Sequence, residues 1–134
     1  KTTMLKGTVR SAAGDHIVVR TGDFDFTVKK RDEVKPGTEV WMSIRPQDVQ
    51  YGSETGENTL TGTVDYLEPL GAVTRGEIKT DHGFSLMFEI ANPLYSRVPN
   101  LKEKVSMSVG ADRIVYGVMT ASDHDVFGEL EKGA

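Results

Sequence analysis

Cysteine is missing from all 134 residues, which excludes a disulfide framework and a thiolate metal site. An excess of positive charge is missing too, because 16 Lys and Arg stand against 20 Asp and Glu, a net charge of -4. Proteins that bind phosphate backbones concentrate Lys and Arg, so nucleic acid is disfavoured as a partner. No apolar run approaches the roughly 20 residues that span a bilayer, and no charged-then-apolar start suggests a signal peptide. These absences predict a soluble domain that is stabilised by packing alone.

Motifs for catalysis and metal binding are also missing. The sequence has neither a G-x-S-x-G nucleophile elbow nor a G-x-x-x-x-G-K-[ST] phosphate loop. Its three histidines, His16, His82 and His124, show no metal-ligand spacing such as H-x-x-x-H. We interpret His82 as a turn residue and Asp123-His124-Asp125 as part of a solvated tail. The sequence therefore predicts a binding or regulatory module with no catalytic residue and no metal site.

What the sequence does contain is period-two alternation of apolar and polar residues, which is typical of half-buried strands. Turn signals rich in Gly, Pro and Asp separate the alternating runs. Helical periodicity is almost absent, and only the stretch 92–97 favours one short helical turn. The runs lie at residues 5–10, 24–29, 40–45, 60–64, 84–90 and 105–109. We therefore expect an all-β fold.

An internal repeat organises these strands. Lys6-Gly7-Thr8-Val9 returns as Thr61-Gly62-Thr63-Val64, so Gly7 and Gly62 are equivalent positions. A later pair of equivalent segments, at 40–44 and 105–109, is separated by a longer interval. The second copy is thus about ten residues longer, and we place the addition around 91–102. Each half has too few strands to leave its sheet edges open, so we expect closure into a barrel or exchange of strands between the halves.

The repeat divides a single domain, residues 1–134, into four parts. We place the first half at about 4–50, a polar linker at about 51–57, the second half at about 58–118 and a tail at about 119–134. Trp41 lies on the strand face opposite Val40, where it would pack between the halves or lie at a partner interface. The one basic run, at residues 29–31, is followed by two acidic residues and is interpreted as a solvated strand end.

Two ordered segments carry a resemblance to a known family. In the first, Ile44-Arg45-Pro46 ends a strand, because Pro46 cannot donate to the ladder and favours an extended Arg45, and Asp48 follows. In the second, Gly62-x-Val64 is followed by Glu68 and Leu70-Gly71. Together they resemble the TOBE domain, the C-terminal regulatory domain of ATP-binding subunits in bacterial and archaeal ABC importers. Gln47 stands where that family usually has Glu.

This resemblance implies two tandem OB-like, Mop-like halves that form a β-barrel-type domain. Arg45 and Glu68 are then the residues expected at partner or regulatory contacts, with a surface salt bridge as the alternative for Arg45. Gly62 and Gly71 are expected to be structural, the first for close strand approach and the second for a corner with positive φ.

The resemblance also implies a cellular setting. The domain itself would hold no cofactor, because ATP and Mg²⁺ would belong to an ATPase domain expected upstream of Lys1. The implied partners are that ATPase domain, a second copy of the chain and, through the full protein, membrane permease subunits. We therefore expect a cytoplasmic protein that is peripheral on the inner face of the cell membrane.

The second half also resembles the molybdate-binding Mop module. In that module a Ser-Ala-Arg-Asn loop precedes the Leu-x-Gly strand, and here the corresponding residues are Thr55-Gly56-Glu57-Asn58. Only Asn58 matches, and the Glu57 carboxylate would repel an anion that Arg would attract. Asn58, Gly71 and Ala72 make up the candidate ligand loop. The alternative function is thus a free-standing protein that binds molybdate or tungstate. A third hypothesis, OB-type binding of single-stranded nucleic acid, is disfavoured by the charge and by an aromatic content of 7%.

Overall fold

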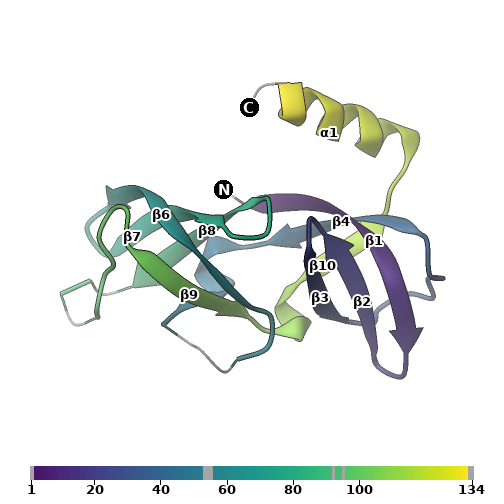
Figure 1. Cartoon of the computed structure of the whole chain (residues 1–134), viewed down its shortest axis with the longest axis horizontal. Coiled ribbons are helices and arrows are strands. Elements are labelled where there is room, and N and C mark those ends of the chain that lie inside the picture. Colours follow the sequence, from purple (N-terminus) through teal and green to yellow (C-terminus); the bar gives the residue numbers. More distant parts are fainter. Residues whose placement is uncertain (1, 53–55, 92, 95, 133–134) are drawn as a thin grey trace.

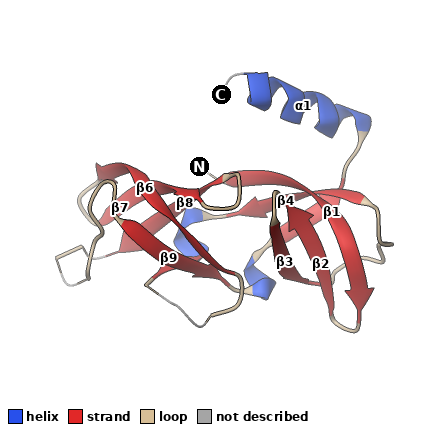
Figure 2. Cartoon of the chain, viewed as in Figure 1, coloured by secondary structure: helices blue, strands red, loops and turns tan. Residues whose placement is uncertain are grey.

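The computed structural model describes residues 2–52, 56–91, 93–94 and 96–132 of the chain. This part contains strands, two short 3₁₀ helices and one α-helix (Figure 2). The first-half elements are β1 (Thr3–Ala13), β2 (His16–Thr21), β3 (Phe24–Lys29), β4 (Glu39–Ile44), η1 (Pro46–Asp48) and β5 (Val49–Tyr51). The second-half elements are β6 (Thr59–Pro69), β7 (Val73–Thr80), β8 (Ser85–Ala91), β9 (Lys104–Val109), η2 (Ala111–Arg113) and β10 (Val115–Val118), followed by α1 (Ala121–Lys132). None of the described helices is long and apolar enough to cross a membrane.

The strands form two antiparallel sheets that repeat one plan (Figure 1). One sheet has the order β10-β4-β1-β2-β3 and the other the order β5-β9-β6-β7-β8. The last strand of each half therefore joins the sheet of the other half. Tyr116 of β10 pairs with Met42 of β4, and Tyr51 of β5 pairs with Met107 of β9. The predicted all-β fold of two OB-like halves is confirmed, and of the two predicted ways to close their sheet edges the structure shows the exchange of strands.

Each 3₁₀ helix comes just before an exchanged strand, η1 before β5 and η2 before β10, and packs against the opposite half. The helix η1 packs against β8, and β5 also contacts β8, so the first half supplies the closure of the second sheet. In the same way η2 packs against β3. Met42 and Met107 occupy equivalent buried positions in the core that lies inside the two curved sheets. This arrangement covers edges that each half would otherwise leave open, as expected for OB-like halves.

Gly7 and Gly62 occupy equivalent places in β1 and β6. A Cβ added to Gly7 would lie 2.5 Å from Val19 Cγ1, and one added to Gly62 would lie 2.6 Å from the carbonyl oxygen of Lys79. Both strands therefore approach their neighbours too closely for any larger residue, which confirms the predicted role of Gly62.

The additional length of the second half is distributed along it, so the prediction that places it around 91–102 is only partly right. Equivalent strands begin at His16 and Val73 for β2 and β7, at Phe24 and Ser85 for β3 and β8, and at Glu39 and Lys104 for β4 and β9. The difference in residue number between the first residues of two equivalent strands increases from the first of these pairs to the last. The strand β7 and the turn after it hold part of the addition, because the longer β7–β8 hairpin tolerates extra residues at its exposed end.

The tail contains the helix α1, which was not predicted from the sequence, whereas His124 and Asp125 are exposed as predicted for a solvated segment. A reciprocal capping box starts α1: the Asp123 N–H donates to Thr120 Oγ1 over 3.2 Å, and the Thr120 N–H donates to the Asp123 carboxylate over 2.9 Å. Phe127 is 8% exposed, and His124 Nε2 lies 3.4 Å from Glu39 Oε2 of β4. Apolar burial and this contact hold the helix beside the first sheet.

Two other predictions fall partly outside the described residues. The predicted helical turn at 92–97 includes positions 92 and 95, which are not described, while Pro93 and Leu94 form a turn. The predicted linker at about 51–57 includes positions 53–55, which are likewise outside the described part.

Candidate functional site

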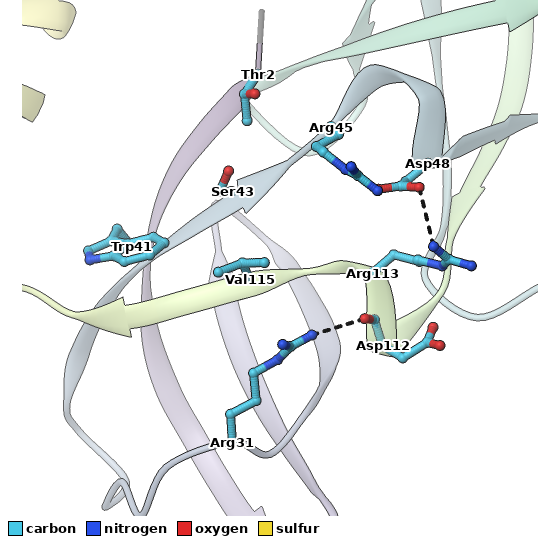
Figure 3. A pocket seen from close by; sticks show the side chains of 9 residues that line it. All are labelled: Thr2, Arg31, Trp41, Ser43, Arg45, Asp48, Asp112, Arg113 and Val115. Carbon is cyan, nitrogen blue, oxygen red and sulfur yellow. Dashed lines mark hydrogen bonds and ion pairs between the residues drawn. The ribbon is translucent and has the colours of Figure 1, made fainter.

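A cavity of about 470 Å³ lies where the two halves exchange their strands (Figure 3). Its wall takes residues from β4 and η1 of the first half, from the segment after β3, and from η2 and β10 of the second half. The described lining residues are Thr2, Arg31, Trp41, Ser43, Arg45, Asp48, Asp112, Arg113 and Val115. The site therefore depends on the strand exchange, because neither half alone supplies the whole wall.

Arg45 and Asp48 form the first charged pair of the wall. The residue before a proline is extended, and Arg45 accordingly has φ -80° and ψ 138° before Pro46 starts η1. One turn later, the Asp48 carboxylate accepts a hydrogen bond from Arg45 Nε over 2.8 Å. The Asp48 side chain is 9% exposed and that of Arg45 is 56% exposed. Arg45 thus forms the salt bridge that was the alternative to a partner contact, and its side chain also lines the cavity.

Arg113 adds a second guanidinium from the opposite half. It follows Asp48 by the same interval that separates Val40 from Val105 in the repeat, so the two are equivalent positions that carry opposite charges. Arg113 Nη1 lies 3.8 Å from Asp48 Oδ1. The helix η2 that carries Arg113 is fixed at its start by the Glu57 carboxylate, which accepts a hydrogen bond from the Ala111 N–H over 3.2 Å.

Arg31 adds a third guanidinium and is positioned by the exchanged strand. The N–H groups of Arg31 and Asp32 donate to Tyr116 Oη of β10 over 2.8 and 3.0 Å. Arg31 Nη2 donates to the main-chain oxygen of Asp112 over 3.0 Å. Within the described part of the chain, no carboxylate forms an ion pair with the Arg31 guanidinium. Among the described residues, Arg31 therefore brings to the cavity a guanidinium whose partner is a main-chain oxygen and not a carboxylate.

The cavity has a positive excess among its described lining residues, because three guanidinium groups face two carboxylates. Guanidinium groups present planar sets of N–H donors that match the oxygens of phosphate, sulfate or carboxylate groups. No group of His, Cys, Asp or Glu in the described residues could hold a metal ion. The lining has the chemistry to bind an anion and, among its described residues, lacks a recognisable nucleophile with its base.

Glu68, the other predicted contact residue, lies elsewhere. It belongs to β6 and lines a separate cavity with Tyr66, Arg75, Glu77 and Met87. The Tyr66 hydroxyl donates to the Glu68 carboxylate, and this hydrogen bond, followed by burial, raises the pKa of Tyr66. The structure therefore does not bring Arg45 and Glu68 into one site.

The candidate ligand loop is likewise divided. Asn58 Oδ1 accepts a hydrogen bond from the Thr27 N–H over 2.7 Å, and Asn58 Nδ2 donates to the carbonyl oxygens of Thr27 and Val109 over 2.9 and 3.0 Å. This side chain thus ties the two halves together. Gly71 and Ala72 lie in the turn at the other end of β6, where Gly71 has the expected positive φ, 83°. In this chain the three residues do not form one site.

Two arginines of the cavity were not identified from the sequence. The basic run at 29–31 gave no reason to place Arg31 in a site, because its position depends on Tyr116, far along the chain. Arg113 could have been found by aligning the repeat further, which sets it against Asp48. For Trp41 the sequence left two alternatives, packing between the halves or a partner interface. The indole packs against Gly117 of β10, so closely that a Cβ added there would lie 2.5 Å from it, which agrees with packing between the halves.

The fold defines a class of protein: a domain built from two β-barrel-like halves with exchanged strands. A family model described as "TOBE domain" matches residues 42–116, which is more than half of the chain. The chain therefore belongs to the TOBE domain family. The matched segment begins in β4, ends in β10, and contains Arg45, Asp48 and Arg113.

The fold is similar to that of a solved structure. This is a crystal structure of ModG with molybdate bound, described as a cytoplasmic molybdate-binding protein. The TM-score is 0.77 at 16% sequence identity, and the match covers 87% of this chain and 96% of that chain. The likeness shows a common fold, including both halves. The search of curated proteins found no match.

Proposed function

We propose that this TOBE domain binds a small oxyanion in the cavity between its two halves. One observation carries the proposal: guanidinium groups from three separate segments, those of Arg31, Arg45 and Arg113, line one cavity. Burying or crowding like charges is unfavourable unless opposite charge compensates them. The two lining carboxylates compensate only in part, and an anion would complete the balance. The ModG fold, which holds molybdate in its own structure, supports the same chemistry.

The cavity is a better candidate for this role than the loop at 55–58. Glu57 places a carboxylate in that loop, and this carboxylate accepts a hydrogen bond from Ala111. The Asn58 amide is occupied by Thr27 and Val109. A ligand at the loop would have to break these bonds, whereas a ligand in the cavity meets donors that are already exposed.

The test is a titration with molybdate, tungstate, sulfate and phosphate, each at constant ionic strength. Binding to the folded state raises the melting temperature according to RT ln(1 + [L]/Kd). We expect saturable stabilisation by at least one of the four anions, and a Kd that is about tenfold weaker in Arg113→Gln and in Arg31→Gln, since each variant removes one charged contact of roughly 1.4 kcal/mol.

The matched control is Arg20→Gln, which removes an arginine that pairs with Asp25 outside the cavity. This variant should bind as the unmodified chain does. The proposal fails if none of the four anions raises the melting temperature, or if Arg20→Gln weakens binding as much as the cavity variants do.

A second candidate function is the regulatory and dimerisation domain of an ABC importer's ATP-binding subunit. The observation in its favour is the ion-paired strand exit at Arg45 and Asp48, which the TOBE model includes. In this function Arg45 and Glu68 contact partners, and a separate ATPase domain binds ATP and Mg²⁺. The partners would be that domain, a second copy and membrane permease subunits, at the cytoplasmic face of the membrane.

Two measurements test this second function. The gene should encode a phosphate-binding G-x-x-x-x-G-K-[ST] segment upstream of Lys1. Light scattering should show pairing of the chain that Arg45→Gln or Glu68→Gln weakens, while Arg20→Gln leaves it unchanged. A gene without such a segment would contradict this function and leave the oxyanion proposal intact.

A further inference from the structure

A second cavity adjoins the arginine cavity. It measures about 430 Å³ and is lined by Met4, Trp41, Ser43, Asp123, Val126 and Phe127. Trp41 and Ser43 line both cavities, so the two meet at these side chains. Its walls are more apolar than those of its neighbour, and they come from β1 and β4 on one side and from α1 on the other.

Trp41 forms the floor that the two cavities share. The indole rests directly on the backbone of β10, because Gly117 has no Cβ to hold it away. Figure 3 shows the indole and Val115 toward one end of the arginine cavity and the side chains of Arg45, Asp48 and Arg113 toward the other. Two of the three guanidinium groups thus lie at the end away from Trp41. Arg31 lies below Val115, with its guanidinium directed to Asp112. The apolar surface begins at Trp41.

Helix α1 supplies Asp123, Val126 and Phe127 to the wall of the apolar cavity. Figure 1 shows the helix above the strands β1 and β4. Phe127 is 8% exposed, whereas Val126 and Met4 are 58% and 42% exposed. The one carboxylate of this wall, Asp123, accepts the helix-capping hydrogen bond from Thr120. The helix therefore leaves apolar side chains uncovered beside Trp41.

We infer that the natural occupant is an organic anion, whose oxyanion group is held by Arg31, Arg45 and Arg113 and whose aromatic body lies on Trp41 beneath α1. The inference rests on the proposed function, and it adds the class of ligand. A bare oxyanion would satisfy the guanidinium groups and leave Trp41 and its apolar neighbours in contact with water. An attached ring would cover that surface, and ring packing on an indole adds to the gain from apolar burial.

The test compares two ligands with the same head group: phenyl phosphate and methyl phosphate. Trp41 is the single tryptophan of the chain, so its fluorescence reports on this site directly. We expect phenyl phosphate to bind about tenfold more tightly, because partial burial of a ring contributes about that factor. Calorimetry of the same titrations measures the two Kd values independently of the fluorescence change.

Variants on α1 locate the ring. Phe127→Ala should bring the phenyl-to-methyl affinity ratio close to one, and Val126→Ser should reduce it about threefold. Val126 is exposed, so its substitution preserves the fold even if the loss of Phe127 detaches the helix. The matched control is Leu101→Ser, which changes an exposed apolar residue outside both cavities and should leave the ratio unchanged.

The outcomes separate this inference from the proposed function. If both phosphates bind equally and Arg113→Gln weakens both, the inference is wrong and the oxyanion function stands. If phenyl phosphate binds through Phe127 while bare oxyanions and methyl phosphate do not saturate, the organic-anion inference stands and the small-oxyanion proposal is wrong. If neither phosphate binds and no oxyanion stabilises the chain, both fail.

Discussion

The two halves of this domain follow one plan, and they differ most where the fourth strand of each half ends. Strand β4 leaves through Arg45-Pro46 into η1, whereas β9 leaves through Gly110-Ala111 into η2. The equivalent positions at the ends of these two helices, Asp48 and Arg113, carry opposite charges and face each other over 3.8 Å. The repeated plan therefore supplies a symmetric scaffold, and divergence at equivalent positions makes the cavity polar and one-sided.

The halves also differ in how the long connection before the fourth strand is held. In the first half, Tyr116 of the exchanged β10 binds the main chain at Arg31 and Asp32. Its equivalent, Tyr51 of β5, contacts the Glu103 carboxylate at 3.5 Å, the limit of a hydrogen bond. The position of Arg31 in the first half thus depends on Tyr116 from the second half. Tyr51 of the first half makes no comparably short hydrogen bond to the second half.

The largest expected effect tests whether the two halves tolerate the same change. Gly62→Ala would place a Cβ against main-chain atoms of Lys79 and Thr80, and it should destabilise the fold by about 3 kcal/mol. Gly7→Ala would meet one main-chain atom, the carbonyl oxygen of Arg20, and otherwise the side chains of Val19 and Thr21, so it should cost less, about 2 kcal/mol. Urea denaturation measures both losses. A larger loss for Gly7→Ala would show that the halves are not packed as their backbones indicate.

Asn58→Ala is the next largest change, and it breaks the clamp between the halves. The substitution leaves the Thr27 N–H without its acceptor and the carbonyl oxygens of Thr27 and Val109 without their donor. It also puts Ala at a φ of 49°, which favours Asn. We expect a loss of about 2 kcal/mol in the free energy of unfolding by urea denaturation. A loss below about 0.5 kcal/mol, the size of an ordinary surface substitution, would contradict the clamp.

The strand pattern and the repeat were predictable from the sequence because both are local or periodic signals. Alternation places Met42 and Met107 inside, and a matching Gly7 and Gly62 reveal the duplication. The helix α1 was missed although Thr120 and Asp123 form a capping pattern, because its apolar periodicity is weak. The cavity required knowledge of the strand exchange, since only the pairing of β10 with β4 brings Arg31 toward Arg113.

Tyr116→Phe against Tyr51→Phe tests the unequal dependence of the halves. Removing the Tyr116 hydroxyl leaves two main-chain N–H groups without an acceptor in a part-buried place, and should cost about 1 to 2 kcal/mol. The same change at Tyr51 removes only the long contact with Glu103 and should cost less than about 0.5 kcal/mol. Tyr116→Phe should also weaken anion binding, because Arg31 loses its anchor. Equal losses in the two variants would contradict the comparison.

The smallest expected effect lies in the turn after β7 and appears only in acid. Hydrogen bonds from Lys104 and Thr61, in that order, lower the pKa of Asp81. A carboxyl group whose pKa is lower in the folded state stabilises the fold above its unfolded-state pKa, and this contribution disappears as the pH falls through the lower, folded-state value. Asp81→Asn should therefore be less stable than the unmodified chain at pH 7, and the difference should shrink below about pH 4. Urea denaturation across this range measures the convergence, and Lys104→Gln should flatten the same acid limb. A difference that stays constant down to about pH 2 would mean that the Asp81 contacts stabilise the turn without depending on its charge.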